Sequence, residues 1–159
     1  PNDTTASLHD KLAEQGGQLL LEVLDQVRRG TLQPVPQPAE GITYAHKIEK
    51  HEASIDWQQP AEQIARRIRA FNPFPGASTH AAGEVIKLWL AQVHAGDGAA
   101  PAALPGTVLA ADAQGVVIQC GLGVLRATEL QRAGGKRLQA TEFLRGFTLS
   151  PGTVLGAAA

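Results

Sequence analysis

Apolar residues recur at helical spacing near the start of the chain and at strand spacing in its second half. The first set predicts helices that begin near Thr5 or Ser7, either of which suits an N-cap, and end at Gly30. A break at Gly16–Gly17 would divide this stretch into two helices. Residues 33–41, which include three prolines, then form an extended connector. The apolar helical positions are Leu8, Leu12, Leu19, Leu20, Val23, Leu24 and Val27.

One further helix is predicted from residue 60, with Ile64, Ile68 and Phe71 on one face at spacings of four and three. It should end at about residue 71, because Pro73 disfavours the α conformation at Asn72. Two prolines flank Phe74 and are expected to hold it in extended backbone. Gly76 then permits the sharp exit that a following strand needs.

Beyond Gly76 the chain changes to short β-rich runs separated by Gly, Pro and Asp, at spacings typical of a small antiparallel barrel or meander. The low-complexity segment 96–104 is expected to be a long mobile loop. Residues 141–147 predict a short helix capped by Thr141, with Glu142 in its first turn. These elements together predict an α+β chain that is mainly β. The expected strands are Ala77–His80, Glu84–Val93, Gly106–Ala110, Val116–Cys120 and Val124–Gln131.

Composition narrows the class of protein. A chain of 159 residues with 43% hydrophobic content can bury one core, and it has no apolar run of about 18 residues. No signal segment opens it and Cys120 is its single cysteine, so we expect a soluble, cytoplasmic protein with no membrane partner and with Cys120 buried. Residues 1–65 carry a net charge of −5 and residues 66–159 of +4, which favours an anionic partner for the second part.

Residue types of catalytic and metal sites occur without the spacing that those sites need. Ser7, His9 and Asp10 are neighbours on one helical turn and point in different directions, unlike a catalytic triad. The two histidines of segment 46–51 are not an i, i+4 pair, and no third ligand is apparent. Trp89 falls in the strongest strand pattern and is expected in the core. The pattern therefore yields no catalytic, cofactor-binding or metal-binding residue.

The helix stop Arg69–Gly76, Arg-Ala-Phe-Asn-Pro-Phe-Pro-Gly, closely resembles the Arg-x-x-Asn-Pro-x-Pro signature of the methionyl-tRNA formyltransferase family. The resemblance extends along nearly the whole chain and thins only at its Ala/Gly-rich end. The other matching segments are Asp3–Leu12, Thr43–Ile48 through Ile55–Trp57, Lys87–Trp89, Pro105–Val108 and Leu130–Lys136.

The resemblance implies a three-part layout. Residues 1–38 would be the terminal helices of a Rossmann-like formyltransferase domain, residues 39–56 a linker, and residues 57–159 a C-terminal, OB-like open antiparallel barrel. The apolar helices of the first part would lack the sheet that they pack on, so we expect them to dock on the barrel, to self-associate with a second copy, or to fray.

The resemblance also implies an activity. The family transfers a formyl group from 10-formyltetrahydrofolate to the amine of methionyl initiator tRNA, a step of translation initiation and protein biosynthesis. Its catalytic Asn, His and Asp lie in the N-terminal domain, whereas this chain has only Asn2 and Asn72, neither in a matching context. This part of the transferase alone is therefore expected to be catalytically incompetent, with no cofactor of its own and the folate cosubstrate held elsewhere.

Basic residues are the expected functional surface, because cations that track an RNA backbone supply most of its affinity. The expected partner is initiator methionyl-tRNA, bound weakly and without strong sequence preference. The candidate nucleic-acid-binding residues are Arg66, Arg67, Arg69, Lys87, Arg126, Arg132, Lys136 and Arg137.

Two other functions remain open from the sequence. Formyltransferases that act on amino-sugar nucleotides share an Asn-Pro-x-Pro stop and a similar C-terminal extension, although the match over Leu130–Lys136 favours the tRNA enzyme. A free-standing, non-enzymatic nucleic-acid-binding barrel is the other alternative, and the unpartnered apolar helices argue against it.

Overall fold

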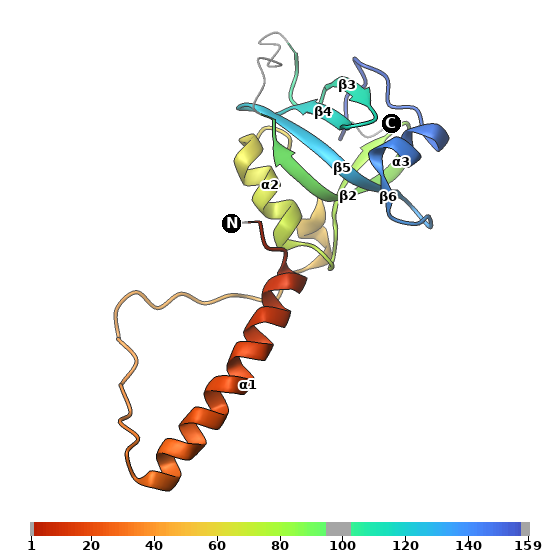
Figure 1. Cartoon of the computed structure of the whole chain (residues 1–159). Helices are drawn as coiled ribbons and strands as arrows, with labels where there is room; N and C mark the ends of the chain where they lie inside the picture. The colour runs from red at the N-terminus through yellow and green to blue at the C-terminus, as the bar shows by residue number, and fades with distance from the viewer. Residues whose placement is uncertain (1, 95–102, 157–159) are drawn as a thin grey trace.

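The computed structural model describes residues 2–94 and 103–156, and most of the predicted loop at 96–104 lies outside this part. The described residues form helices and one antiparallel sheet, which confirms the α+β, mainly β prediction (Figure 1). The helices are α1 (Thr5–Arg29), α2 (Ala61–Ala70) and α3 (Ala140–Gly146), with a 3₁₀ turn at Lys50–Ala53. The strands are β1 (Ala77–Ala81), β2 (Glu84–Val93), β3 (Val108–Asp112), β4 (Gly115–Gln119), β5 (Val124–Arg132) and β6 (Leu138–Gln139).

The sheet has the order β1-β2-β5-β4-β3, with β6 paired to β5, and every pairing is antiparallel. The two longest strands, β2 and β5, form its centre. Their register shifts between Leu88 and Leu90 and again between Leu90 and Ala91. Such bulges bend a strand and redirect its side chains, and here they surround Trp89.

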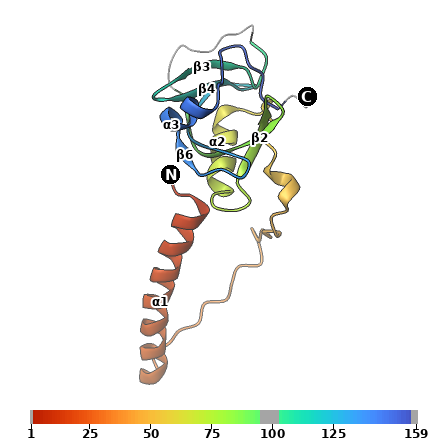
Figure 2. The ribbon, with the colours of Figure 1, turned by 90° about the vertical axis from the view of Figure 1, so that its right-hand side faces the viewer.

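The helix α2 covers one face of the sheet and packs on β2 (Figure 2). Its buried face consists of Ala61, Ile64, Ala65 and Ile68, at the spacing that the sequence predicts. The core continues through the sheet to Phe143 of α3, which lies 5.5 Å from the Phe147 ring between ring centroids. Cys120 and Trp89 are both buried, as expected, at 1% and 4% exposure.

The prediction of two N-terminal helices is wrong, because α1 runs unbroken through Gly16–Gly17. Each glycine costs only about 1 kcal/mol in a helix, and good helix formers flank the pair on both sides. The helix ends at Gly30, as predicted, and Gly30 adopts the left-handed conformation.

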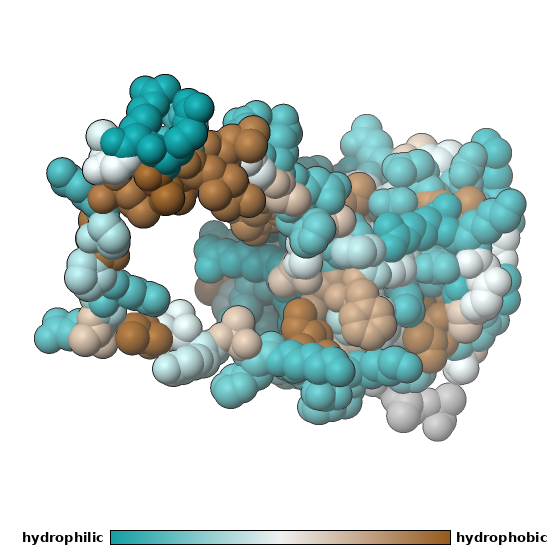
Figure 3. All heavy atoms as spheres, turned by 90° about the horizontal axis from the view of Figure 1, so that it is seen from below, coloured by the Kyte–Doolittle hydropathy of each residue, from teal (hydrophilic) through white to brown (hydrophobic). Residues whose placement is uncertain are grey.

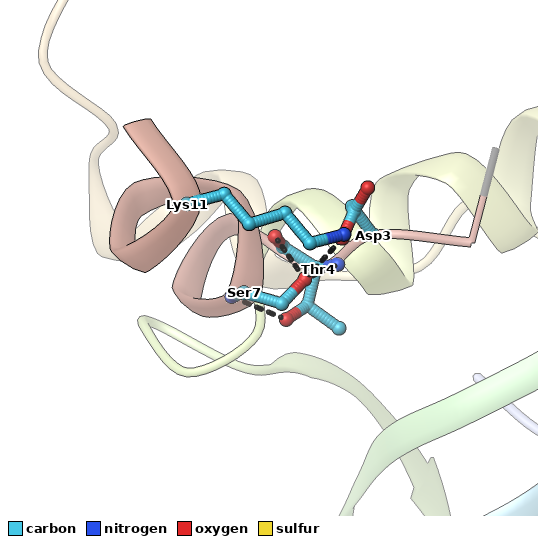
Figure 4. A network of polar contacts seen from close by, with 4 residues as sticks. All are labelled: Asp3, Thr4, Ser7 and Lys11. Carbon is cyan, nitrogen blue, oxygen red and sulfur yellow. Dashed lines mark hydrogen bonds and ion pairs between the residues drawn. The ribbon is translucent and has the colours of Figure 1, made fainter. Parts of the chain in front are cut away.

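The N-cap of α1 is Thr4 rather than Thr5 or Ser7. Thr4 accepts a hydrogen bond from the Ser7 backbone N–H, and the Ser7 hydroxyl accepts one from the Thr4 N–H, so the two form a capping box (Figure 4). Asp3 accepts hydrogen bonds from Lys11 and Ser7, and these bonds hold the pKa of its carboxyl below the usual value. Ser7 is therefore committed to the helix start, away from His9 and Asp10.

No residue of α1 is buried, and the helix projects from the sheet domain (Figure 1). Hydrophobic side chains gather on it, on the side that faces the connector across an open gap (Figure 3). Within the described residues, α1 is hydrogen-bonded to α2 and the turn that follows it through its first turn: the Ala6 N–H donates to the Asn72 carbonyl at 3.2 Å, and the Thr5 hydroxyl to the Ala70 carbonyl. The exposed apolar residues of α1, at 39–69% exposure, are Leu8, Leu12, Leu19, Leu20, Leu21, Val23, Leu24 and Val27.

Two local predictions need correction. Residues 71–75 form a tight turn with cis bonds before Pro73 and Pro75, rather than extended backbone, and Phe74 is 57% exposed. The N-cap position of α3 is Gln139, whereas the Thr141 hydroxyl donates a hydrogen bond to the Ala113 carbonyl at 2.7 Å.

No helix among the described residues is both long enough and apolar enough to cross a membrane. No group of three or more His, Cys, Asp and Glu side chains in residues 2–94 and 103–156 could hold a metal ion.

Candidate nucleic-acid interface

The turn after α2, Asn72–Pro73–Phe74–Pro75, is the junction at which the candidate surface is assembled. Asn72 is buried at 8% exposure, and its side-chain amide donates to the Trp89 carbonyl at 3.0 Å. Its side-chain oxygen accepts a hydrogen bond from Arg137 at 3.4 Å, and its backbone N–H donates to the Arg69 carbonyl. Asn72 thus joins the end of α2, the middle of β2 and the loop between β5 and β6.

Two of the predicted cations meet at the Trp89 ring. The Arg137 guanidinium carbon lies 3.4 Å from the ring centroid, and the Lys87 ammonium lies 5.5 Å from it. Lys87 also donates to the Pro75 carbonyl at 2.8 Å. Both distances are within cation–π range, so the aromatic ring holds the two positive charges at one place.

Trp89 is itself held in a fixed orientation. Its indole N–H donates to the Gln131 side chain at 2.8 Å, and Gln131 donates in turn to the Gly135 carbonyl. Gly76 leaves the turn at φ +83°, and a Cβ there would lie 2.6 Å from the Trp89 ring. A glycine is therefore required both for the backbone conformation and for the close approach of the ring.

Arg66 and Arg69 lie beside the start of α1, on the exposed side of α2. They line a hollow of about 340 Å³ together with Leu8 and the segment Asp3–Thr5. Arg69 also borders a second hollow, of about 260 Å³, which Leu90 and its neighbours line. Arg66 pairs with Glu62 at 3.2 Å, with both side chains 71% exposed, so this ion pair contributes little.

Lys136 lines a small hollow of about 150 Å³ together with Arg132 and Glu142, at the C-terminal end of β5. Arg132 donates to both oxygens of Glu84, at 3.0 and 2.7 Å, and lies 5.2 Å from the Phe147 ring centroid. The hydrogen bonds from Arg132 to Glu84 raise the pKa of the guanidinium, and the pair is locally neutral.

Two of the predicted residues do not join the others. Arg67 is half-buried, donates to the Glu52 carbonyl and lies over the Phe71 ring at 5.2 Å, which makes it part of the packing. Arg126 lies further along β5, where it donates to the Gln114 side chain at 2.9 Å. The structure therefore brings Lys87 and Arg137 together at the Trp89 ring. Asn72, which contacts Arg137, also donates its backbone N–H to the Arg69 carbonyl.

Asn72, Gln131 and Trp89 orient the cations, a role that the sequence pattern did not indicate for them. Their partners lie 17 to 65 positions away, and no local spacing reveals such contacts. The available signal was the segment match around Leu130–Lys136, because it includes Gln131 and ends next to Arg137.

The fold and the surface define a small antiparallel β domain with a cationic edge, linked to an amphipathic helix. The profile of the family "Formyl transferase, C-terminal domain" matches residues 47–148, which is more than half of the chain. The chain therefore belongs to the family of formyl transferase C-terminal domains.

Curated relatives extend the similarity over the rest of the chain. The methionyl-tRNA formyltransferase of Delftia acidovorans (strain DSM 14801 / SPH-1) is 60% identical over 99% of the chain, which covers 48% of that relative. The methionyl-tRNA formyltransferase of Acidovorax ebreus (strain TPSY) is 57% identical over 99% of the chain and 49% of the relative. The chain thus spans about half the length of the curated relatives it matches.

Solved structures show the same fold. A crystal structure of a HypX variant from Aquifex aeolicus aligns with a TM-score of 0.66 and 25% identity over 95% of this chain and 27% of that one. HypX of the same organism in complex with tetrahydrofolic acid aligns with a TM-score of 0.66 at 24% identity, covering 91% of this chain and 25% of that one.

Proposed function

We propose that this chain is the tRNA-docking C-terminal part of an enzyme that transfers a formyl group from 10-formyltetrahydrofolate to methionyl initiator tRNA. The observation that carries the proposal is the 57–60% identity, over 99% of the chain, to proteins named methionyl-tRNA formyltransferase. Identity at this level across the full chain includes the surface residues as well as the core.

The chain supplies docking rather than chemistry in this proposal. Formyl transfer needs a base or orienting group for the amine and donors for the oxyanion. The sequence has two asparagines. The side chain of Asn72 is hydrogen-bonded to Trp89 and Arg137, and Asn2 is exposed on the segment before α1. The folate cosubstrate and the catalytic groups are therefore assigned to the half of the enzyme that lies outside this chain.

The docking surface is the edge formed by Lys87, Arg137 and Lys136, extended by Arg69 toward α1. Cations in this arrangement position an RNA backbone without reading its sequence. Arg67 and Arg126 are left out of the proposed surface because packing and the Gln114 side chain engage them.

The helix α1 belongs, in this proposal, to the domain that precedes the linker, as expected for residues 1–38. Its exposed apolar side would pack there in the whole enzyme, and in the isolated chain it would pair with a second copy. Deleting residues 1–38 and measuring the mass by size exclusion with light scattering tests this: loss of a dimer supports it, and an unchanged dimer overturns it.

A titration with two ligands tests the proposed function against its nearest alternative. Fluorescently labelled initiator tRNA and an amino-sugar nucleotide are each titrated with the chain at low salt, in the reducing conditions of the cytoplasm. Binding of tRNA in the micromolar range, with no saturable binding of the sugar nucleotide, is the expected result. Binding of the sugar nucleotide alone would overturn the proposal.

A further inference from the structure

The guanidinium of Arg137 is held by two contacts within the chain, although the residue is exposed. Its carbon lies 3.4 Å from the centroid of the Trp89 ring, and one N–H donates to Asn72. Trp89 as a whole residue is 4% exposed, and its indole N–H donates to the Gln131 side chain. An exposed arginine normally samples many rotamers, so this degree of fixation needs a physical cause.

The cause is the orientation of the Asn72 side chain. Only its nitrogen can donate to the Trp89 carbonyl, and the 3.0 Å hydrogen bond therefore turns its oxygen toward Arg137. The turn that contains Asn72 is anchored in addition through its backbone, to Arg69 on one side and Ala6 on the other. The position of Arg137 is thus set by a buried residue of the Asn-Pro-Phe-Pro turn.

Arg137 differs from Arg66 and Arg132 in its charge balance. Arg66 is paired with Glu62 and Arg132 with Glu84. Arg137 makes no ion pair within residues 2–94 and 103–156, and only one of its N–H groups has a hydrogen-bond partner there. Lys87, held against the same ring, adds a second charge without a carboxylate partner in the described residues.

We propose that Arg137, stacked on Trp89 and oriented by Asn72, is a preorganised clamp for one backbone phosphate of the RNA, and that Asn72 and Trp89 are its positioning residues. The planar fork of a guanidinium matches two phosphate oxygens, and a fork that is already immobilised loses little entropy on binding. Lys87 supplies charge at the same phosphate. The inference rests on the proposed function, because it names one contact within the tRNA-docking surface.

Three variants distinguish a phosphate clamp at Arg137 from a contribution of its positive charge alone. Binding of initiator tRNA is measured over a salt series for the original chain and for Arg137→Ala, Arg137→Lys and Arg126→Ala. The last is the matched control, since Arg126 is an arginine of the same sheet that is bonded to a neutral side chain. We expect Arg137→Ala to weaken binding about five- to tenfold at low salt and to reduce the salt slope by about one.

The Arg137→Lys variant tests whether binding depends on the geometry of the guanidinium or only on its charge. Arg137→Lys keeps the charge but loses the stacked, two-pronged contact, so it should weaken binding at least threefold, while Arg126→Ala changes it less than twofold. An Arg137→Lys variant that binds as well as the original chain would overturn the clamp and leave the proposed function intact. If the original chain itself shows no tRNA binding, the proposed function fails and the clamp fails with it.

Double variants test the positioning residues. Trp89→Leu and Asn72→Ser are each combined with Arg137→Ala, and the fold of every variant is checked by circular dichroism. Each single change should weaken tRNA binding about as much as Arg137→Lys does. In the Arg137→Ala background, Asn72→Ser should add nothing, and Trp89→Leu should add only the smaller loss that comes from its contact with Lys87. A further loss from Asn72→Ser, or an undiminished loss from Trp89→Leu, would show that these residues act independently of Arg137. If either variant fails to fold, the Arg137→Lys comparison still decides the clamp.

Discussion

The Asn72 side-chain amide donates a hydrogen bond to the Trp89 backbone carbonyl at 3.0 Å and so joins the end of α2 to β2. Asn72→Ala would leave that buried carbonyl without its partner, at a cost of about 1–3 kcal/mol. Urea unfolding should show this loss. Asn2→Ala, at an exposed asparagine, is the control and should change the free energy of unfolding by less than about 0.5 kcal/mol. Equal effects of the two changes would contradict a structural role for the Asn72 amide.

Gly121 is the tightest glycine position of the described chain, because a Cβ there would lie 1.8 Å from the Gln58 carbonyl oxygen. Its N–H donates to the Trp57 carbonyl at 2.9 Å, which fixes the two segments against each other. Gly121→Ala should destabilise the fold by about 3 kcal/mol or more. The control is Gly146→Ala in α3, where a Cβ would meet open space and the unfolding midpoint should stay or rise slightly. Similar melting temperatures for the two variants would contradict the packing at Gly121.

Gly16 and Gly17 lie inside α1, and a Cβ at either would meet open space. Replacing each by Ala should stabilise the helix by about 1 kcal/mol and increase the helical circular dichroism signal. Gly30→Ala should act in the opposite direction, because Gly30 ends the helix at φ +69°. An unchanged signal in the first two variants would mean that α1 is not a continuous helix in solution.

Burial raises the pKa of the Cys120 thiol from 9.0 to about 11. Below pH 9 the thiol is protonated in both folded and unfolded chains, so it causes no pH dependence there. Between pH 9 and 11 the unfolded chain loses this proton first, and the stability of the fold should fall as the pH rises. The free energies of unfolding of the original chain and of Cys120→Ala, plotted against pH, should therefore converge or cross in this window. The alanine variant has no thiol to ionise, so its stability does not fall for this reason. Parallel curves would contradict a buried, protonated thiol, as would rapid reaction of the native thiol with a disulfide reagent at pH 8.

Local patterns predicted the elements better than their contacts. The strand runs and α2 were placed within one or two residues, because Gly, Pro and Asp mark the ends of the β-rich runs and the Ile64, Ile68 spacing marks the buried face of α2. The unbroken α1 was missed because two adjacent glycines indicate a break when only the local sequence is considered. In a helix of 25 residues, the helix-forming residues on both sides offset their cost. The turn around Phe74 was missed because the two prolines fix φ at their own positions but do not set the direction in which the chain turns.

The fold brings only some of the predicted cationic residues close to one another. Arg67 and Arg126 are engaged by residues that are 12 or more positions away, and Arg132 by Glu84 at a distance of 48 positions. Charge composition shows how many cations a segment carries, but tertiary contacts decide which remain available. Arg137 and Lys87 are the pair that the sheet brings to one aromatic ring.

The salt dependence of initiator tRNA binding tests the docking function most directly. With about four phosphates neutralised, the logarithm of the association constant should fall against the logarithm of salt concentration with a slope of about −3. The measurement uses the whole 159-residue chain, titrated into labelled tRNA between about 50 and 200 mM salt. A slope near −3 is the result that tRNA docking predicts, and binding that does not change with salt would contradict it.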